Sequence, residues 1–205
     1  DWLMSTTENR EGNPEGFEDS DLIETYLDGE TVYRGSFFNV EKDRVCLPNG
    51  AIATREYIRH PGAVVILPLF DDGTVLLERQ FRFPVNRIFL EFPAGKIDKG
   101  EDTLDSAKRE LKEETGYSAS NWQYVTTIHN AIGYSDEQLI VYLAKDLQAG
   151  SARPDEEEFV QTFRTPVSQL LEWVKNGTIT DVKTVIGSFW LEKIVNNQWE
   201  AEKVV

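Results

Sequence analysis

The pattern of apolar and polar residues predicts that the chain begins with β-strands. Two runs rich in strand-forming residues, TVYRGSFFNVEK and AIATREYIRH, are separated by LPNG, whose Pro-Asn-Gly sequence is a turn signal. They predict a small antiparallel β-subdomain at residues 22–60. The stretch before it, residues 1–21, is polar and rich in Glu, Asn, Gly and Pro, and we expect it to form a flexible arm.

Three longer apolar runs follow the first sheet. AVVILPLF and TVLLERQFRF flank the turn sequence DDG and predict a hairpin of apolar strands. RIFLEFPAG predicts one more strand, which ends at the Pro and Gly of that run. These strands are expected to carry the main hydrophobic core.

A helix is predicted directly after these strands. Leu104, Ala107 and Leu111 recur at helical spacing, Thr103 is expected to be the N-cap, and Gly116 is expected to end the helix. Beyond it, strands are predicted near residues 122–129, 138–144 and 159–165, and helices near 167–176 and 181–195.

The order of these elements predicts an α+β fold, because strands and helices are mixed without strict alternation. We expect one main domain at residues 61–198, followed by a short tail at residues 199–205.

Composition and charge narrow the range of functions. The 205 residues are 40% hydrophobic and 28% charged, as in a folded globular protein, and the formal net charge is -15. Such a charge disfavours nucleic acid and anionic membranes as partners. Cys46 is the single cysteine, and no apolar run reaches the length of a membrane span, so we expect a cytoplasmic protein.

Three glutamates stand together on the predicted helix. Glu110, Glu113 and Glu114 are spaced so that their side chains project from one face. One interpretation is a solvated acidic face, softened by neighbouring basic residues. The other is a site for a hard cation such as Mg²⁺, which takes carboxylate oxygens as ligands.

The spacing around these glutamates decides between the two interpretations. Gly95 and Glu101 are separated by five residues, seven more residues lead to Arg109, and the sequence then reads RELKEETGY. This stretch resembles the Nudix signature, G-x5-E-x7-R-E-U-x-E-E-x-G-U, in which U is a large apolar residue. All of the required identities are present, and Tyr117 stands at a position where an aliphatic residue is commoner.

The resemblance implies the Nudix fold, a mixed β-sheet sandwiched between helices, with the signature forming a loop, a helix and a loop. It also implies metal ligands: the backbone carbonyl of Ala94 and the side chains of Glu110 and Glu114, with Glu113 as a shared or outer ligand. Mg²⁺ is the expected ion, and Mn²⁺ is a further possibility. Arg109 and Glu101 are expected to pair and to orient these carboxylates.

The flanking residues resemble one branch of the family. ERQFRF, LEFPAGKID and the strands upstream are similar to enzymes that hydrolyse ADP-ribose and related nucleoside diphosphate sugars. This resemblance implies a homodimer formed through residues 22–60. It also implies that Arg82 binds the substrate's phosphates, and Glu91 is expected to support the metal site.

The catalytic base is sought downstream, in the acidic stretch DEEE before the strand near residue 160. Glu158 matches the family's position best, with Glu156 and Glu157 as alternatives. All of these residues could also form a solvated loop.

The loop NAIGYSDE bears on the substrate. Gly133 and Glu137 match the family's sugar-binding loop and Tyr134 could stack on the base, but Ile132 stands where ADP-ribose-specific members carry a proline. A GDP-sugar of the GDP-mannose type therefore remains an alternative substrate. A catalytically inactive Nudix ligand sensor is the alternative from another class, disfavoured because every signature carboxylate is retained.

Overall fold

The structure is a computed structural model that describes residues 18–153 and 159–205. It divides into two compact units, Asp1–Tyr57 and Ile58–Val205, which we describe separately.

The first unit is an antiparallel sheet with the strand order β1-β2-β3. Its elements are the 3-10 helix η1 (Asp19–Asp21) and the strands β1 (Thr25–Arg34), β2 (Asn39–Cys46) and β3 (Ile52–Arg59), of which β3 runs on into the second unit. The predicted LPNG turn is present between β2 and β3, where Gly50 has a φ of +82° and its N–H donates to the Leu47 carbonyl. β1 begins at Thr25, before the run that predicted it. The first residues of the strand, TYLDGE, are largely polar and give no strand signal in the sequence.

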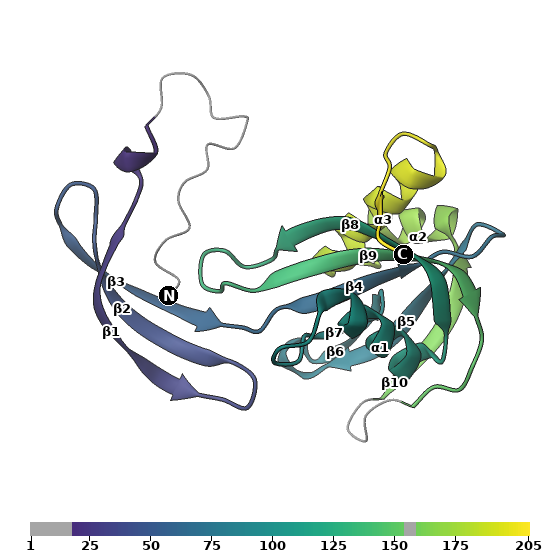
Figure 1. Ribbon diagram of the computed structural model, residues 1–205, viewed down its shortest axis with the longest axis horizontal. Coiled ribbons are helices and arrows are strands. Elements are labelled where there is room, and N and C mark those ends of the chain that lie inside the picture. Colours follow the sequence, from purple (N-terminus) through teal and green to yellow (C-terminus); the bar gives the residue numbers. More distant parts are fainter. Residues whose placement is uncertain (1–17, 154–158) are drawn as a thin grey trace. The chain divides into compact units, whose positions relative to one another are not determined.

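The second unit contains two sheets, visible in Figure 1. The larger has the order β11-β8-β9-β4-β7, and its strands are β4 (Ala63–Pro68), β7 (Ala94–Lys96), β8 (Ser118–His129), β9 (Gln138–Gln148) and β11 (Glu202–Lys203). The smaller has the order β10-β5-β6, with strands β5 (Thr74–Arg82), β6 (Arg87–Glu91) and β10 (Val160–Pro166) and the 3-10 turn η2 (Phe83–Val85). β4 and β9 are parallel and the other pairs are antiparallel, so the sheet is mixed, as predicted.

The predicted hairpin of β4 and β5 is wrong. The two strands meet only at a single bridge, between Leu69 and Val75, and then enter different sheets. All six residues of β4 are buried, so this apolar run is a central strand, flanked by β9 and β7 rather than by the next strand in the sequence.

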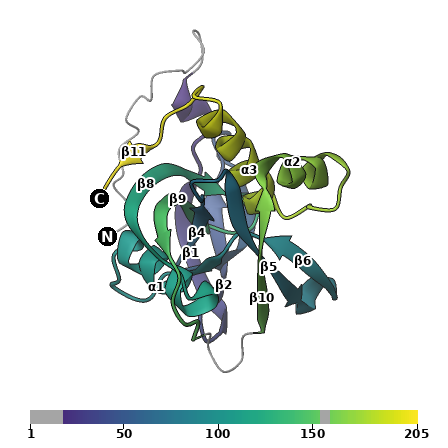
Figure 2. The same cartoon turned by 90° about the vertical axis from the view of Figure 1, so that its right-hand side faces the viewer.

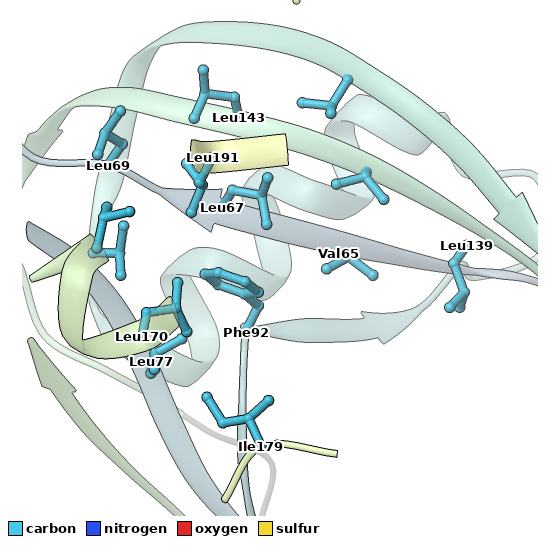
Figure 3. Packing of buried hydrophobic residues seen from close by; sticks show 14 of the residues in the cluster. Val65, Leu67, Leu69, Leu77, Phe92, Leu139, Leu143, Leu170, Ile179 and Leu191 are labelled. Atoms are coloured by element: carbon cyan, nitrogen blue, oxygen red, sulfur yellow. The ribbon is translucent and has the colours of Figure 1, made fainter. Parts of the chain in front are cut away.

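The larger sheet separates two hydrophobic layers, because alternate residues of β4 point to opposite faces. Val65 and Leu67 pack into a core with residues of the smaller sheet and of α2 (Val167–Lys175) and α3 (Val182–Val195), shown in Figure 3. Val64 and Ile66 pack with residues of α1 (Thr103–Thr115) on the other face. Figure 2 shows α1 on one side of the unit and α2 and α3 on the other. The expected mixed sheet between helices is confirmed.

Each helix begins close to its predicted start, with one correction. The N-cap of α1 is Asp102, not Thr103, because its carboxylate accepts hydrogen bonds from the backbone N–H groups of Leu104 and Asp105. Gly116 ends α1 in the left-handed conformation, as expected. None of the helices in residues 18–153 and 159–205 combines the length and apolar character that crossing a membrane requires.

Candidate active site

The glutamates of α1 differ in their exposure. Glu110 and Glu114, one turn apart, are buried, with residue exposures of 8% and 3%. The side chain of Glu113 is 37% exposed. Burial of two carboxylates at this spacing is unfavourable without nearby positive charge. A merely solvated acidic face would leave all three exposed, so this burial argues against that interpretation.

Arg109 provides positive charge beside this cluster. Its Nε and Nη2 atoms donate to the two carboxylate oxygens of Glu101 at 3.0 and 2.9 Å, a two-point contact that fixes the guanidinium plane. Its Nη1 donates to Glu110 at 2.8 Å and to Glu113 at 3.1 Å. The expected pairing of Arg109 with Glu101 is therefore present, and the same side chain holds two of the three helix glutamates.

The pairing changes the acidity of both partners. Hydrogen bonds from Arg109 lower the pKa of Glu101 from 4.5 to about 2, although partial burial acts in the opposite direction. The pKa of Arg109 is raised, chiefly by its hydrogen bonds with Glu101. Glu101 thus stays ionised at pH values well below those at which an unperturbed glutamate takes up a proton.

We expect Glu101→Gln to reduce stability in a pH-dependent way. Because the folded-state pKa of Glu101 lies below that of an unperturbed glutamate, its stabilisation is complete above pH 4.5 and is lost as the pH falls towards about 2. Solvent screening of a side chain that is 19% exposed limits this contribution to about 2 kcal/mol.

Urea unfolding of both proteins between pH 7 and pH 3 measures this difference. The gap in the free energy of unfolding should narrow as the pH falls. A matched control is Glu172→Gln, which removes an exposed glutamate on α2 and should change stability by less than about 0.5 kcal/mol. A gap that is constant with pH would contradict the ionic role of Glu101.

Gly95 explains how Glu110 fits against β7. A Cβ atom at position 95 would lie 1.9 Å from the Glu110 carboxyl carbon and 2.1 and 2.3 Å from its oxygens. The carboxylate of Glu110 therefore occupies the space that any other residue's side chain would take. The signature glycine is needed here for this close approach, since the structure gives it no positive φ.

We expect Gly95→Ala to impair catalysis more than folding. The added methyl group displaces the Glu110 carboxylate, which is the end of a flexible side chain, so the fold can adapt while the carboxylate is misplaced. Turnover should fall by about 10-fold to 100-fold, as when groups that orient metal ligands are lost. Steady-state kinetics and thermal unfolding measure the two effects.

Gly73→Ala is the control for Gly95→Ala. Gly73 has a φ of +78°, and an added Cβ would meet nothing within 4 Å. This variant should lose about 1–2 kcal/mol of stability through backbone strain and keep its activity. If Gly95→Ala shows that same pattern, the glycine serves the backbone and not the position of Glu110.

The donor chemistry of this cluster fits a divalent cation. Glu110 and Glu114 offer oxygens of the kind that Mg²⁺ binds, beside Ala94 on β7. Within the described ranges, no three His, Cys, Asp or Glu side chains are grouped closely enough to hold a metal ion by themselves. The Arg109 guanidinium donates to one carboxylate oxygen of Glu110 and to one of Glu113.

Arg82 lies at the end of β5 and contacts Glu91 on β6. Its Nε and Nη2 atoms donate to the two Glu91 oxygens, both at 2.8 Å, while 41% of its side chain remains exposed. Burial alone would raise the pKa of Glu91, but Arg82 and Lys183 outweigh that effect and lower it. Glu91 therefore braces Arg82.

Sequence reasoning missed Lys183, on the first turn of α3. Its Nζ donates to Glu91 and, at 2.9 Å, to Asp181, the N-cap residue of α3. A lysine at the positive end of a helix is locally unfavourable. That unusual position, two residues after a capping aspartate, is the one signal in the sequence that could have pointed to it.

The loop between β8 and β9 carries the other predicted substrate residues. Gly133 and Tyr134 are exposed, and the Glu137 carboxylate accepts a hydrogen bond of 2.8 Å from Asn130. Ile132 is 83% exposed.

Residues 58–60 anchor this loop. The N–H of Ile58 donates to the Tyr134 carbonyl at 2.8 Å, and Asp136 accepts hydrogen bonds from Arg59 and from the His60 N–H. The predicted base, Glu158, and its alternatives Glu156 and Glu157 lie outside the described residues.

Comparison with known proteins identifies the family. The NUDIX domain matches residues 59–184, and the nucleoside diphosphate sugar hydrolase N-terminal domain matches residues 24–58. The chain therefore belongs to the Nudix hydrolase family, as its signature predicted. Nudix hydrolases generally need a divalent metal.

Individual relatives are similar over most of their length. The chain is 35% identical over 173 residues to an ADP-ribose pyrophosphatase of Bacillus subtilis, covering 83% of this chain and 94% of that protein. It is 36% identical over 165 residues to a methanol dehydrogenase activator of Bacillus methanolicus, covering 80% and 89%. A crystal structure of an ADP compounds hydrolase matches with a TM-score of 0.76 and 27% identity, covering 86% of this chain and 97% of that one.

Proposed function

We propose that the chain hydrolyses the diphosphate of ADP-ribose, or of a related nucleoside diphosphate sugar, to a nucleoside monophosphate and a sugar phosphate. The observation that carries this proposal is the carboxylate cluster of α1, in which two glutamates are buried and Arg109 orients Glu110. The similarity to ADP-ribose pyrophosphatases supports the substrate.

In this proposal Glu110, Glu114 and the Ala94 carbonyl hold Mg²⁺, with Glu113 as a shared or outer ligand. When bound, the metal supplies positive charge for the diphosphate and lowers the pKa of a water molecule. Arg109, held by Glu101, keeps Glu110 and Glu113 in place. Mn²⁺ could take the same oxygen ligands.

The remaining residues act on the substrate and on water. The exposed part of the Arg82 guanidinium binds phosphate oxygens, and Glu137, Gly133 and Tyr134 contact the sugar and the base. Glu158 accepts a proton from the attacking water, whose oxygen forms a bond to one phosphorus while the bridging P–O bond breaks. Each product carries one phosphate group.

A GDP-sugar of the GDP-mannose type is the second candidate substrate. The identity of residue 132 favours this candidate. Ile132 is 83% exposed and lies on the loop that carries Gly133 and Glu137. ADP-ribose-specific members resembled by this chain carry proline there, so the loop's shape can differ in the feature that selects the sugar.

A substrate panel tests the proposal and separates the two candidates. ADP-ribose, GDP-mannose and other nucleotide sugars are incubated with the protein and with a phosphatase that releases phosphate from the products alone. We expect phosphate release from ADP-ribose only when Mg²⁺ or Mn²⁺ is present. Faster release from GDP-mannose would favour the second candidate, and no release from any substrate with either metal would overturn the enzyme assignment in favour of a ligand sensor.

We also propose that the protein is a cytoplasmic homodimer that uses the first unit as its contact surface. Val45 is the one buried apolar residue among the described residues of that unit, and a three-stranded sheet needs a covered apolar face to be stable. The exposed apolar side chains that support this are Tyr26, Leu27, Val32, Tyr33, Phe37 and Ile52. Light scattering after size-exclusion chromatography tests the dimer, and a monomeric mass at micromolar concentration would refute the dimer.

A further inference from the structure

The charged groups around Glu91 form a network that the carboxylate helix does not explain. Glu91 is 2% exposed and receives hydrogen bonds from two cations, Arg82 on β5 and Lys183 on α3. Lys183 itself is 8% exposed and also contacts Asp181. Residue 91 and residue 183 are far apart in sequence, so tertiary folding alone brings them together.

Burying Lys183 beside Glu91 is energetically unfavourable by itself. Burial removes an ammonium group from water at a cost of several kcal/mol, and the first turn of a helix adds an unfavourable dipole. Arg82 alone already satisfies both oxygens of Glu91 with good geometry. A second buried cation at the same carboxylate therefore needs a reason beyond neutralising Glu91.

The charge balance provides that reason. Arg82 and Lys183 carry two positive charges, and Glu91 and Asp181 carry two negative ones. Without Lys183 the remaining ion-paired groups, Arg82, Glu91 and Asp181, would have a net charge of -1 before Glu78 is counted, and Glu91 would be paired with Arg82 alone. Glu78 on β5 is fully buried and lies directly opposite Glu91 on β6. Its carboxylate also attracts the Arg82 guanidinium. A substrate diphosphate would then meet a guanidinium whose charge is largely cancelled.

The network also adjoins the carboxylate cluster. Ala94 follows Glu91 by three positions, so their Cα atoms lie within about 11 Å of each other. Thr184, next to Lys183, accepts a hydrogen bond from the Phe92 N–H and donates one to Asp181. These bonds connect α3 to the short segment between Glu91 and Ala94.

We propose that Lys183 is a positioning residue for substrate binding. By sharing the charge of Glu91, it keeps the Arg82 guanidinium fixed in place and electropositive toward the diphosphate of the substrate. This role rests on the proposed function, in which Arg82 binds the phosphates. Lys183 does not touch the substrate.

Kinetics of four variants test this role: Lys183→Met, Lys183→Arg, Arg82→Ala and the double variant Arg82→Ala/Lys183→Met. With ADP-ribose and saturating Mg²⁺, we expect Lys183→Met to raise KM about 10-fold with kcat changed by less than about 2-fold, because binding before chemistry is weakened. Lys183→Arg should restore most of the loss. In the Arg82→Ala background, Lys183→Met should change KM by less than about 2-fold, since its route of action is gone.

Several outcomes would overturn the inference. These are an unchanged KM in Lys183→Met, a fall in kcat and thermal stability with no change in KM, or full multiplication of the two effects in the double variant. If Lys183→Met does not fold, Lys183→Gln, which keeps a hydrogen-bond donor and lacks the charge, is tested against the same expectations.

The result also separates this inference from the proposed function. If the wild-type protein hydrolyses no nucleotide sugar, the proposed function fails. If the wild type is active and Arg82→Ala raises KM while Lys183→Met does not, only the role of Lys183 fails.

Discussion

Glu114→Gln should abolish metal-dependent hydrolysis of ADP-ribose while leaving the fold intact. The substitution keeps the size of a side chain that is 3% exposed and replaces one charged oxygen by an amide nitrogen, which cannot bind a cation. Losing residues that merely orient metal ligands costs about 10-fold to 100-fold, and loss of a ligand itself should cost at least as much. The measurement is kcat over a Mg²⁺ titration.

The control for this prediction makes the same change of charge at a site far from the proposed metal ligands in the sequence. Glu172→Gln makes the same chemical change at an exposed site on α2 and should leave both turnover and thermal stability unchanged. Near-normal turnover in Glu114→Gln, at matched thermal stability, would remove Glu114 from the proposed metal site.

Glu158→Gln should reduce kcat by about 100-fold or more with little change in KM. General bases typically contribute about 10²–10⁴ to the rate, and the amide cannot accept the proton of the attacking water. The pH dependence of kcat should also lose its acidic limb. Steady-state kinetics between pH 5 and pH 9 measure both effects.

Glu156→Gln and Glu157→Gln are the matched controls, because they make the same change on the same acidic stretch. Both should retain most of their activity. If one of them loses its turnover while Glu158→Gln is active, the base lies one or two residues earlier in the chain.

Local signals in the sequence predicted the carboxylate helix well. Fixed spacing from Gly95 to Gly116 identified α1 and placed Arg109 beside Glu101, and both features are present. The signature marks Gly95 as a required position but does not show which contact requires a glycine there. The structure shows that Gly95 makes room for the Glu110 carboxylate, which a sequence pattern cannot reveal because it depends on distance across two elements.

Strand partners were harder to predict. β4 is apolar on both faces, so its pattern marks it as buried but carries no information on which strand lies beside it. A short turn suggested pairing with β5, whereas β9, more than 70 residues away, is its parallel neighbour. The start of β1 was missed for a related reason, since its polar residues give no periodic signal.

The network around Glu91 shows the same limit for side chains. A contact between Arg82 and Glu91 could be suspected, because the two residues lie on neighbouring runs of strand residues. The position of Lys183 in the first turn of α3 marks it as unusual, but the sequence does not show that it contacts Glu91, because that contact joins residues 92 positions apart.

The central strand of the larger sheet has a consequence for how the second unit comes apart. Val64 and Ile66 belong to the layer beneath α1, and Val65 and Leu67 belong to the layer beneath α2 and α3, so β4 cannot leave one layer without leaving both. The two layers should therefore unfold as a single cooperative unit, with the amide protons of β4 among the slowest to exchange with deuterium. A separately melting catalytic helix is not expected from this architecture.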